Sequence, residues 1–334
     1  MTRTTTATGP GPAATGPASA TEPGTTATGP ASAAAHPPAA APAPAPAARH
    51  AAPTAPPRPP AAPLTWLYAP GDRPQVVAKA LAAGADVVVV DLEDAVAPER
   101  KGYARAATTE LLGEAQPVPV HVRVNALDGP LARADLEAVA GLPGLSGLRL
   151  PKVTCPEQIA AVAEATARTG RGGPPLYALL ESALGVERAY ALARAHPALR
   201  GIALGEADLR ADLGVREDAG LDWSRSRVVV AARAAGLAPP AQSVHPDTRD
   251  LEGLAASCAH GRALGFLGRA AIHPRQLPII ERAYLPTARE LEEAETIVEA
   301  ATERPGAQAL ADGRFVDAAV VAAARRTLSL ARRP

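Results

Sequence analysis

Short strand-like runs alternate with helical segments along most of the chain, and this alternation limits the possible folds more than any other feature. From Leu64 onward the β-type runs are LTWLYAP, DVVVVDLE, VPVHVRVN, GLRLPK, PLYALLES, GIALGEADL, APPAQSV and GRAAIHP, and segments such as PEQIAAVAEATAR between them have helical periodicity. About eight such repeats over roughly 220 residues are typical of a (β/α)8 TIM barrel, whereas an open doubly wound sheet usually has fewer strands. No GxGxxG follows the first run, so a nicotinamide-binding fold loses its main support. The sequence therefore predicts an α/β TIM barrel over residues 64–285.

The two ends of the chain differ in composition from this repeating part. Residues 1–63 consist almost entirely of Ala, Pro, Thr and Gly. Such a segment cannot bury enough apolar surface to offset the entropy lost on folding, so we expect a disordered tail, with an interaction arm as the alternative. Residues 286–334 add a helical stretch, the loop GAQALADGRFVD and an alanine-rich helix, and they predict a helical lid or oligomerisation extension.

Charge and composition exclude several classes of protein. The chain has 34 basic and 34 acidic residues and no basic stripe, so we expect no nucleic-acid partner. No run approaches the roughly 18 apolar residues of a membrane helix, and the N-terminus lacks the apolar region of a secretory signal. Cys155 and Cys258 lie far apart without metal-ligand spacing, which fits a reducing compartment. We therefore expect a cytoplasmic protein without a membrane partner.

Acidic residues end the second predicted strand. In VVVVDLEDAV four valines are followed by Asp91, Glu93 and Asp94, and such a cluster of negative charge must be compensated. Active sites of TIM barrels lie at the carboxyl ends of the strands, which is where these acids fall. In the next run, HVRVN, polar residues alternate with valines, so Arg123 is expected to face the mouth of the barrel. These four side chains are candidate site residues.

Two further carboxylates follow later strands. Glu181 ends the fifth run, and Asp208, with Glu206 as a further candidate, stands just past the sixth in GEADL. Carboxylates on adjacent strand ends are suited to one Mg²⁺ or Mn²⁺ ion, because these cations prefer oxygen ligands. Acids at such positions also cap helices or pair with arginines, and the residues alone leave both roles open.

Taken together, these motifs resemble the citrate lyase β-subunit family, a branch of the HpcH/HpaI aldolase superfamily of metal-dependent carbon–carbon lyases. The matching motifs, in the family's order, are YAPGDRP, DLEDAV, RVN, LPK, LLES, GEADL, AIHPRQ and GRFVD, and they extend from about Leu64 to the C-terminus. There are two departures from the family pattern. The acid before Asp208 is displaced by one position to Glu206, and Arg269 replaces a usual lysine, which keeps the charge but not the shape. If that position meets a CoA phosphate, the charge needed for binding is kept.

The resemblance implies roles for the candidate residues. Glu181 and Asp208 would coordinate Mg²⁺, with Mn²⁺ as an alternative, and Glu93 and Asp94 would hold metal-bound waters around it. Arg123 would contact a carboxylate or carbonyl oxygen of the substrate.

The family resemblance also bears on assembly. In related malyl-CoA and citramalyl-CoA lyases the aspartate of the late motif enters a neighbouring subunit's site. This points to Asp317 as a catalytic acid/base supplied by another copy of the chain, and it implies a homo-oligomer, a trimer or a hexamer.

The implied reaction is Mg²⁺-dependent cleavage of a β-hydroxyacyl-CoA, such as malyl-CoA or citramalyl-CoA, into acetyl-CoA and glyoxylate or a 2-keto acid. Arg73, after the first strand, is a candidate contact for the acyl-CoA. Three alternatives remain at this point: a CoA-independent aldolase of 4-hydroxy-2-keto acids, a citrate lyase β subunit that needs partner subunits, and a barrel without catalytic activity.

Overall fold

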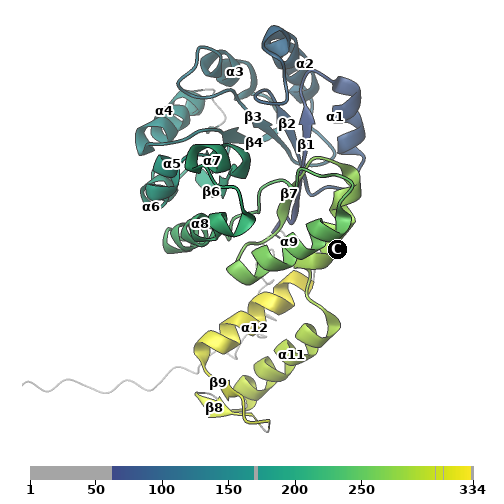
Figure 1. Cartoon of the computed structure of the whole chain (residues 1–334), viewed down its shortest axis with the longest axis vertical. Helices are drawn as coiled ribbons and strands as arrows, with labels where there is room; N and C mark the ends of the chain where they lie inside the picture. The colour runs from purple at the N-terminus through teal and green to yellow at the C-terminus, as the bar shows by residue number, and fades with distance from the viewer. Residues whose placement is uncertain (1–61, 169–171, 305, 311, 332–334) are drawn as a thin grey trace, which may run out of the picture. The chain divides into compact units, whose positions relative to one another are not determined.

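The computed structural model describes residues 62–168, 172–304, 306–310 and 312–331, arranged as an α/β fold (Figure 1). The predicted disordered tail, residues 1–63, therefore lies almost wholly outside the described residues. Within them, strands and helices alternate from the first strand onward, as the sequence predicts.

Seven parallel strands form one curled sheet with the order β6-β5-β4-β3-β2-β1-β7. Because every neighbouring pair is parallel, the carboxyl ends of all seven strands lie at the same edge. The strands are β1 (Thr65–Pro70), β2 (Val87–Asp91), β3 (Val120–Arg123), β4 (Leu145–Leu150), β5 (Leu176–Leu180), β6 (Leu199–Leu204) and β7 (Arg269–Ala271).

The eighth predicted strand, APPAQSV, is not a regular strand. A single parallel bridge joins Gln242 to Arg269 of β7. Hydrogen bonds from Gln242 N to Gly268 O (3.0 Å) and from Ala270 N to Gln242 O (3.0 Å) hold the segment beside β7. The two prolines before it lack the N–H groups that a longer ladder needs. The fold thus agrees with a TIM-barrel-like architecture, and the prediction of eight regular strands is wrong in this one element.

Helices follow most strands, and several begin at residues that favour a helix start. Proline occupies the first turn of α1 and α4, where its missing N–H has no partner to lose, and the Ser182 side chain caps α5. The α-helices up to residue 284 are α1 (Pro74–Leu81), α2 (Lys101–Leu112), α3 (Ala132–Val139), α4 (Pro156–Ala167), α5 (Ala183–Glu187), α6 (Ala189–Ala193), α7 (Glu206–Leu213), α8 (Asp222–Ala234), α9 (Leu251–Leu264) and α10 (Leu277–Tyr284). Short 3₁₀ turns are η1 (Pro98–Arg100), η2 (Asp218–Leu221) and η3 (Pro274–Gln276).

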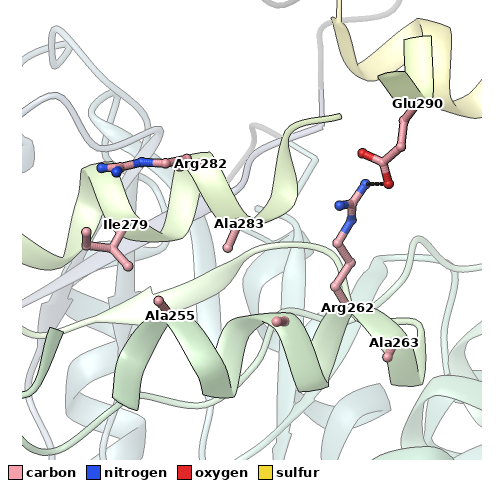
Figure 2. Close-up of a pocket in the computed structure, with 8 residues that line it drawn as sticks. Ala255, Arg262, Ala263, Ile279, Arg282, Ala283 and Glu290 are labelled. Carbon is pink, nitrogen blue, oxygen red and sulfur yellow. Dashed lines mark hydrogen bonds and ion pairs between the residues drawn. The ribbon is translucent and has the colours of Figure 1, made fainter. Parts of the chain in front are cut away.

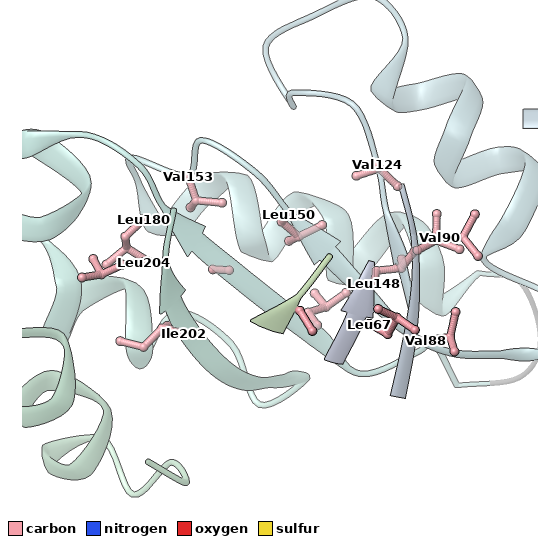
Figure 3. Packing of buried hydrophobic residues seen from close by; sticks show 14 of the residues in the cluster. Leu67, Val88, Val90, Val124, Leu148, Leu150, Val153, Leu180, Ile202 and Leu204 are labelled. Carbon is pink, nitrogen blue, oxygen red and sulfur yellow. The ribbon is translucent and has the colours of Figure 1, made fainter. Parts of the chain in front are cut away.

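The strands bury both of their faces, in two separate apolar clusters. Val88 and Val90 of β2 belong to the large cluster between sheet and helices (Figure 3), whereas Val87 and Val89 pack with Trp66 in a small cluster on the other face. This division follows from the alternation of side chains along a strand. It explains why β2 begins with an unbroken run of valines, a pattern that is typical of parallel strands buried on both faces.

The C-terminal part contains α11 (Ala288–Glu303), a two-stranded antiparallel hairpin of β8 (Gln308–Ala309) and β9 (Phe315–Val316), and α12 (Ala318–Ala331). The predicted helices at this end are therefore confirmed. At the start of α11, Glu290 pairs with Arg262 of α9 at 2.9 Å, beside a groove of about 510 Å³ lined by α9 and α10 (Figure 2). None of the candidate site residues lines this groove. No helix in the described ranges has the length and apolar content that crossing a bilayer requires.

Candidate active site

Arg123 neutralises the first acid of the cluster that ends β2. Asp91 and Arg123 are register partners on neighbouring strands, and two hydrogen bonds join them, from Arg123 Nε to Asp91 Oδ1 (2.7 Å) and from Nη2 to Oδ2 (2.6 Å). Asp91 is 1% exposed and also accepts hydrogen bonds from the backbone N–H groups of Glu93 (2.9 Å) and Ala95 (3.0 Å). Such a bidentate pair fixes the guanidinium plane. Burial lowers the pKa of Arg123, but the hydrogen bonds and charge of Asp91 outweigh it and raise the pKa above its usual value.

The same guanidinium contacts the other two acids of the cluster. Its Nη1 lies 3.1 Å from Glu93 Oε2 and 3.3 Å from Asp94 Oδ2. Glu93 is buried, and burial and the charge of Asp94 raise its carboxyl pKa although Arg123 and Lys152 oppose them. The structure therefore brings together the four residues that the sequence singles out here, Asp91, Glu93, Asp94 and Arg123.

Lys152 is a second cation of the site, and the sequence analysis did not select it. Its Nζ lies 2.5 Å from Glu93 Oε1, 3.4 Å from Asp94 Oδ1 and 3.9 Å from Glu181 Oε2. Lys152 is the only non-glycine residue in the described ranges with a positive φ, 54°, a conformation that side chains with a Cβ adopt at an energetic cost. The one available signal was its place in the LPK motif directly after β4.

Glu181 is the most strongly perturbed acid of the site. It follows β5, is 4% exposed, and accepts a hydrogen bond from Lys152 N (3.1 Å). Burial is the main cause that raises the pKa of its carboxyl to about 8; the charges of Glu93 and Asp208 add to this, while Arg123 and Lys152 oppose it. A carboxyl in these surroundings favours a bound proton or cation over a bare negative charge.

Gly205 makes room for the Glu181 side chain. A Cβ at this position would lie 2.4 Å from Glu181 Oε1 and 2.6 Å from its Cγ. The glycine between β6 and α7 thus allows the carboxylate to occupy the strand-end edge of the sheet.

Asp208 lies in the first turn of α7, and its side chain is exposed. It is close enough to Glu181 for its charge to raise the pKa of that acid. No group of three His, Cys, Asp or Glu side chains is arranged around a common metal position in the part of the chain that the structure describes. The two carboxylates are oxygen donors of the kind that Mg²⁺ prefers, so they fit such an ion, and their role as its ligands stays a prediction.

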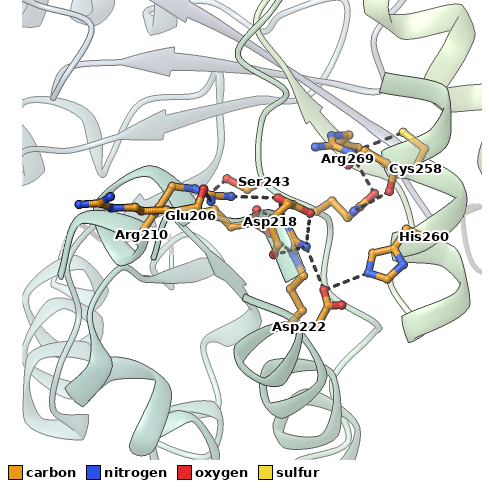
Figure 4. Close-up of polar contacts among 12 residues, drawn as sticks. Glu206, Arg210, Asp218, Asp222, Ser243, Cys258, His260 and Arg269 are labelled. Atoms are coloured by element: carbon orange, nitrogen blue, oxygen red, sulfur yellow. Dashed lines mark hydrogen bonds and ion pairs between the residues drawn. The ribbon is translucent and has the colours of Figure 1, made fainter. Parts of the chain in front are cut away.

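Glu206, the displaced acid of GEADL, belongs to a separate ionic network (Figure 4). Its carboxylate accepts hydrogen bonds from Arg225 Nε (3.0 Å) and Nη2 (2.7 Å), and Arg225 also contacts Asp218 (2.7 Å) and Asp222 (3.0 Å). Arg225 is 2% exposed, so it needs these acids as partners. Glu206 was a further candidate metal ligand. Its carboxylate pairs with the buried Arg225 instead, so Asp208 remains the candidate ligand from this motif.

Three other residues named from the sequence do not join the cluster. Arg73 is exposed just before α1, and no ion pair of its side chain is found among the described residues. Arg269 is buried, with Nη1 2.9 Å from Ser257 Oγ, so it is not available to a CoA phosphate. Asp317 caps α12 by accepting hydrogen bonds from the N–H groups of Ala319 and Val320, both at 2.9 Å, and its action in a neighbouring subunit stays a prediction.

Lys101 holds the backbone of the loop after β2 in place, and no motif in the sequence indicated this contact. Its Nζ donates hydrogen bonds to the carbonyl oxygens of Leu92 (2.8 Å) and Glu93 (2.6 Å). The loop that carries Glu93 and Asp94 is therefore fixed by its backbone as well as by its side chains.

Comparisons with known proteins bear on the family of this chain. The family model described as HpcH/HpaI aldolase/citrate lyase matches residues 64–274. A (3S)-malyl-CoA thioesterase of Cereibacter sphaeroides is 35% identical over 274 residues, which cover 79% of this chain and 93% of that protein. A citrate lyase subunit beta of Escherichia coli is 34% identical over 279 residues, which cover 79% of this chain and 92% of that protein. The crystal structure of CitE from Mycobacterium tuberculosis, in complex with magnesium, acetoacetate and coenzyme A, covers 81% of this chain and 98% of its own, with 34% identity and a TM-score of 0.68.

Proposed function

The chain belongs to the HpcH/HpaI aldolase/citrate lyase family, and from this we propose that it is a Mg²⁺-dependent lyase of a β-hydroxyacyl-CoA. The substrate class is that of malyl-CoA and citramalyl-CoA, and the products are acetyl-CoA and glyoxylate or a 2-keto acid. The similar mycobacterial CitE was crystallised with magnesium, a keto acid and coenzyme A, which supports this combination of ligands.

The excess of acid over base at the strand ends is the observation that carries the proposal. Four carboxylates pair with the two cations Arg123 and Lys152. The most buried of the candidate ligands, Glu181, has a pKa raised to about 8, chiefly by burial, and the charge of Asp208 contributes. A divalent cation held by Glu181 and Asp208 reduces this excess of negative charge. When bound, Mg²⁺ supplies Lewis-acid polarisation of the substrate oxygens.

Arg123 is proposed to hold the substrate oxygen on which negative charge develops. The bidentate pair with Asp91 fixes its guanidinium, and the side chain remains 13% exposed, so it still reaches the surface of the site. A donor that is already oriented stabilises developing charge without reorganisation. Lys152, with a side chain 39% exposed, provides a second positive charge toward a substrate carboxylate.

Asp317 of a neighbouring subunit is proposed to exchange a proton with the acetyl carbon, which requires a homo-oligomer. Mixing two inactive variants, Arg123→Ala and Asp317→Ala, tests this. In a ring with random subunit exchange, about a quarter of the sites would combine an intact Arg123 with an intact Asp317 from the next subunit. Recovery of about that share of activity supports action between subunits. A mixture of Arg123→Ala and Glu181→Ala is the control, because both residues belong to one subunit and no recovery is expected.

The activity itself is tested with malyl-CoA, citramalyl-CoA and a free 4-hydroxy-2-keto acid, each with Mg²⁺ and with EDTA. Cleavage of one CoA ester that needs the metal and is lost in Glu181→Gln supports the proposal. Glu187→Gln, an exposed glutamate at the end of α5, is the matched control and should retain activity. Cleavage of the free acid alone would instead identify an aldolase, and no turnover of any substrate would favour a subunit that needs partners.

Thioester hydrolysis is a second candidate function, because relatives that share 35–36% identity with this chain are named (3S)-malyl-CoA thioesterases. A thiol reagent separates the two reactions. Hydrolysis releases free CoA, whereas carbon–carbon cleavage leaves the thioester intact in acetyl-CoA and yields glyoxylate.

A further inference from the structure

A small cavity is lined mostly by residues near the amino ends of the strands, while Arg149 and Ala203, the penultimate residues of β4 and β6, also line it. It has a volume of about 150 Å³, and Tyr177 at the start of β5, Gly201 at the start of β6 and Leu267 just before β7 line it. The candidate active-site acids, in contrast, stand at or after the carboxyl ends of their strands. The cavity is therefore distinct from the proposed active site.

The walls of this cavity carry positive charge only. Arg149 and Arg200 line it, and no aspartate or glutamate is among its lining residues. Arg149 is 5% exposed, no carboxylate in the described ranges pairs with it, and its Nε–H has no hydrogen-bond partner there. A guanidinium does not lose its proton in proteins, so Arg149 is a buried charge without a counter-ion of its own.

The groups around Arg149 are aromatic. The guanidinium carbon lies 5.8 Å from the ring centres of Trp66 and Tyr68 and 5.7 Å from that of Tyr177. Rings at this distance attract the buried guanidinium, but they carry no negative charge and accept no strong hydrogen bond. His121, which stacks on Tyr177, stays neutral because burial and the charge of Arg149 lower its pKa well below the usual value. None of these groups balances the charge, and leaving a buried charge unpaired is strongly unfavourable.

We propose that this cavity binds one small monovalent anion, of the halide or formate class, through the Nη N–H groups of Arg149, the part of the guanidinium that is accessible from the cavity. A single water has a share of about 30 Å³, so the volume suits one small ion with a few waters and excludes a nucleotide or CoA. The exposed Arg200 marks the solvent side of the cavity and attracts anions toward it. Ordered water alone solvates the guanidinium but leaves its charge unbalanced.

Tyr68 is a neighbour of both arginines. The guanidinium carbon of Arg123 lies 5.4 Å from the Tyr68 ring centre, and that of Arg149 lies 5.8 Å from the same ring centre. Because none of the candidate active-site residues lines the cavity, the anion is proposed as a structural ion that does not occupy a substrate position. Its absence is expected to lower stability before it alters catalysis.

Thermal unfolding of the full chain in bromide tests the proposal. Bromide replaces gluconate, which is too large for the cavity, at constant ionic strength. We expect a saturable rise in Tm for the wild type, because a ligand that binds only the folded state stabilises it. Arg149→Met should abolish this rise, and Arg200→Met, the matched control at the cavity edge, should keep it with weaker apparent affinity.

Two further measurements keep the test decisive if Arg149→Met does not fold. Ala203→Leu fills the cavity and retains both arginines, and it should also abolish the bromide response. In crystals grown with bromide, an anomalous peak is expected within hydrogen-bonding distance of the Nη atoms of Arg149. The proposal is overturned if either variant shows the wild-type bromide dependence or if the anomalous map shows no peak in the cavity.

Discussion

Replacing Gly205 with alanine is expected to displace Glu181 and so to lower Mg²⁺-dependent activity. A Cβ at position 205 would overlap Glu181 Oε1 and lie 2.6 Å from its Cγ, whereas ordinary van der Waals contact begins at 3.4 Å, so the Glu181 side chain or the backbone at Gly205 must shift, by about 1 Å. A misplacement of about 1 Å at a catalytic site costs on the order of 100-fold in rate. We therefore expect kcat/KM to fall by about two orders of magnitude.

Glu181 has little freedom to avoid this displacement. Its side chain is 4% exposed, and the backbone N–H of Lys152 holds one of its oxygens at 3.1 Å. The assay combines steady-state cleavage of the best CoA ester with a Mg²⁺ titration by calorimetry. Both the turnover and the affinity for Mg²⁺ should decrease in Gly205→Ala.

Gly102→Ala is the matched control for this prediction. Gly102 lies in α2, and a Cβ there meets nothing within 4 Å. This variant should keep full activity and gain about 1 kcal/mol of stability, because alanine favours a helix over glycine. Wild-type Mg²⁺ affinity and turnover in Gly205→Ala would refute the assignment of Glu181 as a metal ligand that must be held in place.

Three other substitutions test the contacts of Lys152, Glu206 and Asp218. Lys152→Met should reduce kcat/KM by about 100-fold, the typical loss for one donor to developing charge, and a normal unfolding midpoint would show that the loss is catalytic. Glu206→Gln should lower the free energy of unfolding in urea by about 1–3 kcal/mol, because the buried Arg225 loses a charged partner, while the dependence of activity on Mg²⁺ is retained. Hydrogen bonds from Arg225 lower the pKa of Asp218 from 3.8 to about 2, so its stabilising effect is present above pH 3.8 and is lost as the pH falls toward 2. The Tm difference between the wild type and Asp218→Asn should therefore be constant near pH 5 and shrink as the pH falls from about 4 to 2; a difference that does not change over this range would contradict the pairing.

The sequence was sufficient for the strand-end position of the acids because that inference needs only local patterns. Four valines before Asp91 predict a buried strand, and the structure has β2 end at that residue. The alternation of HVRVN placed Arg123 on the opposite face from the valines, and Val120 and Val122 indeed belong to the large apolar cluster.

The sequence was insufficient where a contact joins distant segments. Lys152 and Glu93 are 59 positions apart, and their meeting depends on the register of three neighbouring strands. The displaced Glu206 was ambiguous for the same reason, since its partner Arg225 lies 19 positions away on α8. The missing eighth strand had a local signal, because two adjacent prolines cannot donate to a ladder.

The acids after β2 have different functions, and their contacts decide which of them contributes to binding a cation. Asp91 is fully engaged by Arg123 and two backbone N–H groups, so its charge serves to orient the guanidinium. Glu93 divides its oxygens between Arg123 and Lys152, whereas the Asp94 side chain is 53% exposed. The uncompensated negative charge therefore lies toward Glu181 and away from Asp91. A divalent cation is expected on that side of the site, where burial and the neighbouring acids already make a bare carboxylate unfavourable.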